Sequence, residues 1–386
     1  MYNKILFFLS TTLISVGFQV SLGLMSSIFA SENKENISTI SLIILQISMC
    51  AGCLYCHKFI KIESSKKVMI YSALFLGFFV LCSCLGGEIV FYVFSVLGGV
   101  ANGFFSLAFL TYMNLICRRQ NLSLFINLIF ASHLLGIFIT FITIRIIMPY
   151  ISMQIIIFTL FIFIVLGVGI ACKFSDIRKP DLKKLIQENK KVDNFKMHLI
   201  LLLCISVLIG YMMGLNFSMI PIKITNLLGK EVWAEICSIN TIVFFVLLLV
   251  FCKFKIIAKV GVGLSGLFLS FSIYLFSQAV SYWDFVIMEI VLTFGVAFYW
   301  GSVIQISNLL FRHYFDYVNG PRTAVIFLAS SLGISIQFFY SELLFVVLSF
   351  VFSIIGILGG LYLSYQVLYI DEVKIEHDDD YQILLD

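Results

Sequence analysis

The chain has 386 residues, of which 61% are hydrophobic and only 12% are charged, and its mean hydropathy is +1.07. This composition excludes an ordinary water-soluble domain, because so few charged residues cannot cover so much apolar surface. The net charge of +4 is small for the length, and we expect no nucleic-acid partner. The sequence therefore predicts a protein whose partner is the lipid bilayer.

Twelve apolar segments are long enough to cross a bilayer, since about 20 helical residues span its hydrocarbon core. Their continuous Ile, Leu, Phe and Val runs favour helices over the short alternating strands of a membrane barrel. The first is kept as a span because Ile28 stands where cleavage of a signal peptide after Ala30 needs a small residue. We predict an all-α membrane protein with spans at 5–29, 39–57, 68–85, 89–116, 122–145, 151–172, 197–220, 232–252, 256–279, 283–311, 321–340 and 342–366.

The spans fall into two groups of six, which predicts two pseudo-symmetric bundles. The domains expected are 1–172, a cytoplasmic linker 173–196, 197–366 and an acidic cytoplasmic tail 367–386. We interpret the linker as a tether between the bundles, with an amphipathic helix on the membrane surface as the alternative.

A short match in sequence accompanies this repeat of spans. Gly99-Val100-Ala101 in the fourth span recurs as Gly295-Val296-Ala297 in the tenth, 196 positions later, and Ser106 and Ser302 keep that offset. Six spans return the chain to its starting side, so the halves would be parallel repeats about an axis along the membrane normal.

The basic residues predict the orientation. If the amino terminus is inside, 21 of the 25 lysines and arginines lie in or beside inner segments, Arg312 and Arg322 among them. A bias of this kind is typical of cytoplasmic loops. We therefore expect a plasma-membrane protein, in the bacterial inner membrane, with both termini cytoplasmic and the outer basic residues limited to Lys34, Arg145, Lys223 and Lys230.

Ten cysteines occur, nearly all inside spans or at their inner ends, where a disulfide framework is not expected. Cys50, Cys53, Cys56 and His57 offer thiolate and imidazole, the ligands that zinc prefers. Spacing of three along a helix turns these ligands away from one face, and cysteine also packs as a small apolar residue. We favour packing, and we predict no metal site and no cofactor.

The plan of the chain resembles the major facilitator superfamily over essentially its whole length apart from the tail. The resemblance rests on twelve spans, the charged segment between the sixth and seventh, and short basic loops after the second and eighth. The family's loop after the second span places a glycine, then an aspartate, before a basic cluster. Here Gly52 and Lys66-Lys67 match, but no aspartate does. A further likeness, to sugar-efflux members, lies in residues 221–229, which close the seventh span.

In such a fold the solute site is expected near the bilayer midplane, lined by the first, fourth, seventh and tenth spans. Neutral amides, hydroxyls and aromatic side chains in these spans suit a neutral or zwitterionic polar solute. The same residue types also pack helices closely in lipid. The candidate solute-binding residues are Gln19, Asn102, Ser106, Asn216, Tyr299 and Ser302.

Ionisable residues within the spans are few. Glu289 in the tenth span is the candidate for the coupling proton, because apolar surroundings favour the neutral form that a proton carrier needs. Its alternative is an outer carboxylate that reaches water or pairs with Lys223. His133, near the centre of the fifth span, is a second candidate, for which a packing role is favoured.

These features predict a secondary transporter, functional as a monomer, that exports a small sugar-like or antibiotic-like compound in exchange for protons. The alternatives are a nutrient uptake carrier of the same fold, and a flippase or polymerase of surface-polysaccharide assembly. No Gly-x4-Gly-Lys-Ser/Thr loop for a nucleotide occurs, and no enzyme activity is expected.

Overall fold

The computed structural model describes residues 2–31, 35–85, 88–116, 119–147, 150–176, 195–251, 255–310, 315–336 and 342–374. Every element in these ranges is an α-helix, which confirms the predicted fold class. The helices are α1 (Tyr2–Ser31), α2 (Glu35–Ile62), α3 (Ser65–Leu85), α4 (Glu88–Ile116), α5 (Arg119–Ile147), α6 (Met153–Ala171), α8 (Phe195–Phe217), α9 (Met219–Leu228), α10 (Lys230–Phe251), α11 (Lys255–Gln278), α12 (Tyr282–Leu310), α13 (Phe315–Ser335) and α14 (Glu342–Lys374).

Each predicted span corresponds to one long helix of the described chain. Ten of these helices are long and apolar enough to cross a membrane by length and composition. α10 has a shorter apolar part, Glu235–Phe251, and α13 carries several polar residues in its first half. These two helices complete the twelve expected from the sequence.

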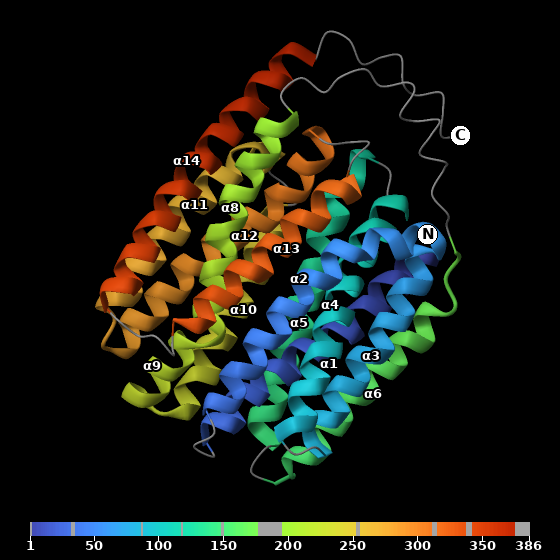
Figure 1. The fold of residues 1–386 in the computed structure, drawn as a ribbon, viewed down its shortest axis with the longest axis vertical. Coiled ribbons are helices and arrows are strands. Elements are labelled where there is room, and N and C mark those ends of the chain that lie inside the picture. The colour runs from blue at the N-terminus through green and yellow to red at the C-terminus, as the bar shows by residue number, and fades with distance from the viewer. Residues whose placement is uncertain are drawn as a thin grey trace.

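The helices pack within two groups. Among the first six, α2 and α3 pack on α4, and α1 packs on α5 and α6. Among the later ones, α8 packs on α13 and α14, and α11 packs on α12 and α14. In Figure 1 the first six, blue to green, lie to the right and the later helices, yellow-green to red, lie to the left. The exact domain boundaries stay a prediction.

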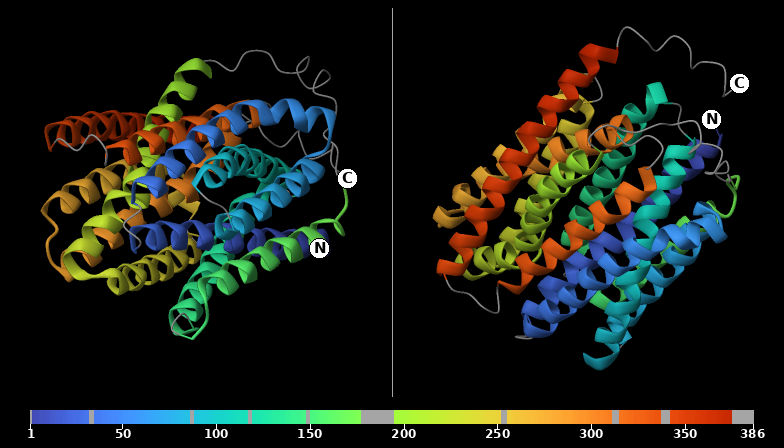
Figure 2. Two further views of the ribbon diagram at one scale, coloured as in Figure 1. Left: turned by 60° about the horizontal axis from the view of Figure 1, so that its bottom comes forward. Right: turned by 45° about the horizontal axis from the view of Figure 1, so that its top comes forward.

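Two helix pairs make the most extensive contacts between the groups. α2 packs along α13, and α5 packs along α10, and the views of Figure 2 show the same neighbours. At the first contact the backbones come close, because a β-carbon on Gly320 of α13 would lie 3.2 Å from the carbonyl oxygen of Cys53. At the second, Ala131 of α5 joins an apolar cluster with Leu248 and Phe251 of α10.

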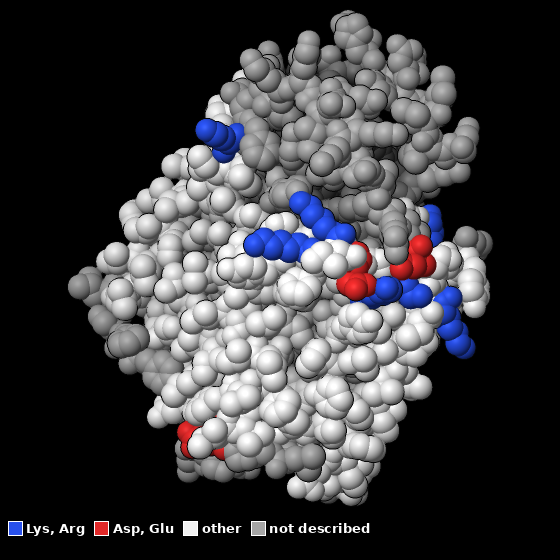
Figure 3. Space-filling model, turned by 45° about the vertical axis from the view of Figure 1, so that its right-hand side comes forward, with Lys and Arg blue, Asp and Glu red and all other residues white. Residues whose placement is uncertain are grey.

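The beginning of α1 and the end of α6 meet at one end of the molecule. The Asn3 side-chain amide donates to Ser175 Oγ at 3.0 Å, and Lys66 Nζ donates to the Cys172 carbonyl at 3.0 Å. The beginning of α8 and the end of α14 lie at the same end in Figure 1. On the face in Figure 3 the lysines and arginines gather toward this end, whereas the lower half is almost uncharged. This asymmetry agrees with the predicted orientation.

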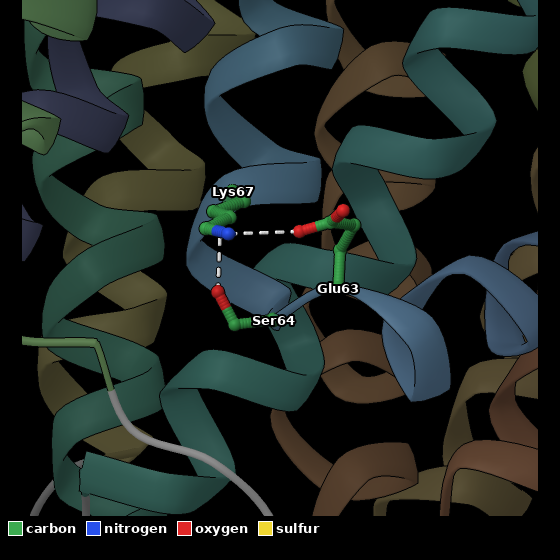
Figure 4. A network of polar contacts seen from close by, with 3 residues as sticks. All are labelled: Glu63, Ser64 and Lys67. Atoms are coloured by element: carbon green, nitrogen blue, oxygen red, sulfur yellow. Dashed lines mark hydrogen bonds and ion pairs between the residues drawn. The ribbon is translucent and has the colours of Figure 1, made fainter.

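The turn after α2 contains an acidic residue, Glu63, although the aspartate of the family's loop is absent. Lys67 Nζ forms an ion pair with Glu63 Oε2 at 2.9 Å, and the Lys67 backbone N–H donates to Ser64 Oγ at 3.3 Å (Figure 4). Ser64 thus caps the first turn of α3. The absent aspartate does not leave the loop without an acidic partner, because a glutamate seven residues after Cys56 supplies it.

Two expectations about loops are wrong. The segment 221–231, expected as an outer connection, is mostly the helix α9, whose end is marked by Gly229 with a φ of 96°. α13 begins at Phe315, six residues before the predicted span, so Arg322 lies two turns inside the helix and not at its inner end. The linker residues 177–194 and the tail from 375 lie outside the described residues, and their predicted roles stay predictions.

The tripeptide match between the halves does not mark equivalent positions. Gly99 of α4 lies against the Leu45 carbonyl of α2, whereas Gly295 of α12 lies against Leu269 of α11. Both bounds of α4 and α12 differ by 194 residues, two fewer than the offset of the tripeptides. Two residues correspond to about 200° of helix rotation, which explains the different neighbours.

Candidate solute and proton sites

A buried arginine lies where the two groups of helices meet. Arg322 on α13 is 0% exposed, and its guanidinium carbon lies 5.7 Å from the centre of the Trp300 ring on α12. None of its three guanidinium nitrogens has a hydrogen-bond partner among the described residues, and no described carboxylate pairs with it. Arg322 is thus a buried cation without a counter-charge in the described chain.

Two polar groups beside this cation make hydrogen bonds with other residues. The Tyr299 hydroxyl and the Cys53 thiol interact with it electrostatically, and the Tyr299 hydroxyl also makes a weak side-chain hydrogen-bond contact with it. The Tyr299 hydroxyl, however, makes its well-formed hydrogen bond with Ser206 Oγ of α8, at 2.9 Å. The Cys53 thiol donates to the Gly103 carbonyl of α4 at 3.5 Å. Neither group is ionised at neutral pH in its ordinary form, so neither neutralises the guanidinium.

Aromatic side chains extend from this point into the first six helices. The Trp300 ring lies 5.8 Å from the Phe130 ring of α5 and 5.3 Å from the Tyr299 ring, centre to centre. One turn before Phe130, Asn127 is 1% exposed, and neither atom of its side-chain amide has a hydrogen-bond partner among the described residues. The Asn127 Oδ1 atom faces Gly301, the residue after Trp300, across the interface.

His133 lies one turn further along α5. Its ring lies 6.2 Å from the Phe130 ring and 6.0 Å from the Phe109 ring. Its Nε2 atom is 3.3 Å from Thr11 Oγ1, and because that hydroxyl donates to the Phe7 carbonyl, it accepts from the histidine. These contacts are those of a packed, hydrogen-bonded histidine, and its coupling role stays a prediction.

A second set of buried polar residues surrounds Glu289 in the first half of α12. Glu289 is 1% exposed, and the Asn240 amide of α10 donates to its Oε2 atom, while its Oε1 atom has no described partner. The Thr293 hydroxyl lies 2.6 Å from Asn240 Oδ1 and 2.7 Å from the Glu289 carbonyl. The unpartnered carboxylate oxygen is an atom at which a proton can reside.

The alternative contacts considered for Glu289 do not form. Lys223 Nζ instead donates to the Phe276 carbonyl at 2.9 Å and lies over the Phe276 ring. Glu289 and Trp300 are eleven residues apart on α12, which corresponds to about 16 Å along the helix. The acidic and the basic group therefore lie at two different depths, the first nearer the end at which α12 begins.

Comparisons with known proteins agree with this architecture. No protein-family model and no curated protein matches the sequence. Solved structures match over nearly the whole chain. A structure of the major facilitator superfamily proton:xylose symporter XylE bound to 6-bromo-6-deoxy-D-glucose aligns at a TM-score of 0.68 and 11% identity, covering 95% of each chain. A D-xylose-proton symporter aligns at 0.65 and 12%, covering 94% and 96%, and a partially occluded inward-open XylE from E. coli at 0.63 and 12%, covering 94% and 98%.

The chain has the major facilitator superfamily fold. This confirms the resemblance drawn from the plan of spans, and it identifies a multi-pass membrane protein. At 11–12% identity the likeness concerns the fold alone, so the roles of individual residues depend on the geometry of this chain.

In this fold the candidate solute residues lie on α1, α4, α8 and α12. Tyr299 lies beside Arg322, while Ser302 is buried against Gly261 of α11, where no β-carbon fits. Asn102 is half-buried, and its amide lies 3.5 Å from Met49 Sδ of α2. Their shared role in binding a solute stays a prediction. The remaining candidates are Gln19, which is exposed, and Ser106 and Asn216, which are half-buried.

Sequence reasoning missed Arg322, Asn127 and Asn240 as site residues. Arg322 was placed at the inner end of its predicted span, because a basic residue near the end of an apolar segment usually marks a cytoplasmic edge. Asn319-Gly320-Pro321 is typical of a turn, so the sequence carries no signal that the helix begins at Phe315 and holds Arg322 two turns inside it. The described structure therefore adds a buried cation to the uncharged candidates, whose roles stay predictions.

The cysteines of α2 pack against α4. The Cys56 thiol donates to the Phe104 carbonyl at 3.4 Å, as Cys53 does to Gly103, and His57 Nδ1 lies 2.9 Å from the Leu54 carbonyl of its own helix. Each side chain therefore has its own backbone contact, as the packing interpretation requires.

Proposed function

We propose that this protein is a proton-coupled secondary transporter that moves a small polar solute by alternating access. The observation that carries the proposal is the Glu289 carboxyl, buried and half-satisfied in a fold that the named proton symporters share. A carboxyl group inside a membrane protein is costly and is typical of proton pathways. The structural neighbours are transporters, which disfavours the polysaccharide enzyme alternative.

For the direction of coupling we propose symport, so that solute and proton enter together. The titles of the similar structures name proton symporters, and nothing in the comparisons supports the efflux or antiport expected from residues 221–229. Those residues form α9, a short helix after α8. The bacterial plasma membrane, cytoplasmic termini and monomeric function stay predictions.

In the proposed cycle Glu289 takes a proton from the outer side when the Asn240 contact opens, and releases it after the two groups of helices have reoriented. The helix pairs α2–α13 and α5–α10 are the contacts about which the groups would rock. His133, as a second candidate, would act only if its contact with Thr11 is broken.

Purified protein in sealed liposomes tests this proposal. A panel of labelled sugars, organic acids and amino acids is offered with the outside more acidic than the inside. We expect at least one solute to accumulate above its equilibrium level and to lose this accumulation when a protonophore is added. Accumulation driven by the opposite gradient would instead establish antiport, and entry that ignores every gradient would remove proton coupling.

A further inference from the structure

We propose that Arg322, held against Trp300, binds an anionic group of the solute, a carboxylate or a phosphate. The inference deepens the proposed function, because it names the chemical class that such a transporter would carry. It departs from the neutral or zwitterionic solute that the sequence suggested.

The first step is the cost of the buried cation. Removing a guanidinium from water costs several kcal/mol, and this cost is repaid only by a nearby opposite charge with good geometry. Arg322 is fully buried, yet no described aspartate or glutamate forms an ion pair with it. Glu289 is on the neighbouring helix, about 16 Å along it from Trp300. The described residues therefore supply no counter-charge, and an anionic ligand would.

The second step excludes neutral neighbours as sufficient partners. The Tyr299 hydroxyl donates to Ser206, and the Cys53 thiol donates to the Gly103 carbonyl. The Tyr299 oxygen also interacts with Arg322, but it is neutral, and no guanidinium nitrogen has a well-formed hydrogen bond in the described chain. A sugar hydroxyl could accept one N–H, but it would not offset the charge.

The third step is the shape of the guanidinium group. The Arg322 guanidinium lies over the Trp300 ring, and an aromatic ring in this position stabilises the charge without satisfying the N–H donors in the guanidinium plane. Those donors are left available to a ligand. Two parallel N–H donors match the two oxygens of a carboxylate or a phosphate, which lysine cannot reproduce.

The fourth step is the position between the two groups of helices. Arg322 and Trp300 belong to the later helices, whereas Phe130 and Asn127 belong to α5. The unpartnered Asn127 amide can donate to an uncharged part of the same solute, or to a further anion oxygen. A ligand held by both groups is coupled to any movement between them, which is what transport requires.

The test uses the full-length protein in detergent and needs no gradient. Trp233 and Trp283 are replaced by phenylalanine, so that Trp300 is the one remaining tryptophan and can be excited selectively over the tyrosines. Its emission and the unfolding temperature are measured with acetate, D-glucuronate, inorganic phosphate and glucose 6-phosphate, at constant ionic strength. D-glucose is the matched neutral probe for the two hexose derivatives.

We expect at least one anion to shift Trp300 emission and raise the unfolding temperature, and glucose to do neither. A response to acetate or glucuronate identifies a carboxylate site, and a response to the two phosphates identifies a phosphate site. Arg322→Gln should weaken the binding about thirtyfold or more, since it removes one partner of a buried charge pair. Arg322→Lys should retain a weaker response, and Lys223→Gln, a control that removes a distant cation, should retain the full response.

The proposal is overturned if no anion acts on the protein that retains Arg322, if glucose acts as strongly as glucuronate, or if the response survives Arg322→Gln. If Arg322→Gln fails to fold, two results still test the proposal. They are the contrast between anions and glucose, and the weaker response of Arg322→Lys. Anion binding without any proton-driven accumulation would refute the proposed function and leave this site in place. Proton-driven accumulation of neutral solutes alone would support the proposed function and refute the anion site at Arg322.

Discussion

The guanidinium carbon of Arg322 lies 5.7 Å from the centre of the Trp300 ring. The same ring lies 5.8 Å, centre to centre, from the ring of Phe130. One tryptophan thereby joins a buried cation of α13 to an aromatic side chain of α5. It is the point at which a charge in the later helices reaches the first six.

Replacing Trp300 should weaken anion binding without abolishing it. Trp300→Ala removes the ring under the guanidinium, and we expect affinity for the responding anion to fall about fivefold to thirtyfold, the value of a desolvated cation–π contact. Trp300→Phe should lose less. The unfolding temperature measured over a range of anion concentrations gives the affinities. Trp283→Phe is the control, because that side chain is 69% exposed, and an equal loss there would contradict the assignment.

Neutralising Glu289 should separate transport from proton coupling. In Glu289→Gln we expect exchange of solute across the membrane to continue while accumulation driven by a pH gradient is lost, because the glutamine carries no proton. Labelled-solute counterflow and gradient-driven uptake measure the two activities. Glu235→Gln is the control, since Glu235 accepts from Tyr282 at 3.1 Å near the outer end of α10.

If Glu289→Gln accumulates solute at the rate of the unchanged protein, the coupling assignment is wrong. If accumulation persists there but is lost in His133→Gln, the coupling group is the histidine.

Asn240 should stabilise the protein through its contact with Glu289. Asn240→Ala leaves both carboxyl oxygens buried without a described partner, and we expect a loss of about 1–3 kcal/mol in the free energy of unfolding. Glu289→Gln in the same background should restore part of it, because a neutral amide is cheaper to bury than a carboxylate. Equilibrium unfolding of the four proteins of this double-mutant cycle gives the coupling. Strictly additive losses would show that the two side chains do not interact.

Close packing between α2 and α4 should make Gly103 intolerant of any side chain. A β-carbon there would lie 2.8 Å from the Cys53 nitrogen, whereas one at Gly169 would meet nothing within 4 Å. We expect Gly103→Ala to lower the free energy of unfolding by about 1–3 kcal/mol, the cost of overpacking. Gly169→Ala should be neutral or slightly stabilising, since it only restricts an exposed helix position. Equal unfolding temperatures for the two variants would refute this packing.

The predicted orientation can be read from an existing thiol. Cys172 is exposed at the end of α6, beside the Lys66 contact at the end where α1 begins. We expect a membrane-impermeant maleimide to label Cys172 in whole cells only after the membrane is opened. Ser277→Cys, exposed at the other end of α11, should be labelled from outside without opening it. The reverse pattern would invert the topology and with it the direction assigned to proton entry.

The sequence by itself determined the number of spans, their helical nature and the plan of two sets of six. These follow from long apolar runs, which in lipid must satisfy their backbone hydrogen bonds internally and therefore form helices. It also singled out Glu289, because a carboxyl group amid apolar residues is conspicuous in any linear reading. It did not fix helix ends, and the six-residue error at α13 placed Arg322 at the inner end of its span instead of two turns inside the helix.

Only the tertiary structure decided which polar groups meet. Asn240 contacts Glu289 across 49 residues of sequence, and Phe130 contacts Trp300 across an even longer separation, so neither pair has a local signature. The matched tripeptides at Gly99 and Gly295 misled for the same reason, since a two-residue shift rotates a helix onto another neighbour. Hydropathy is a property of each segment alone, whereas burial of a charge depends on which helix faces it, and that is settled by packing.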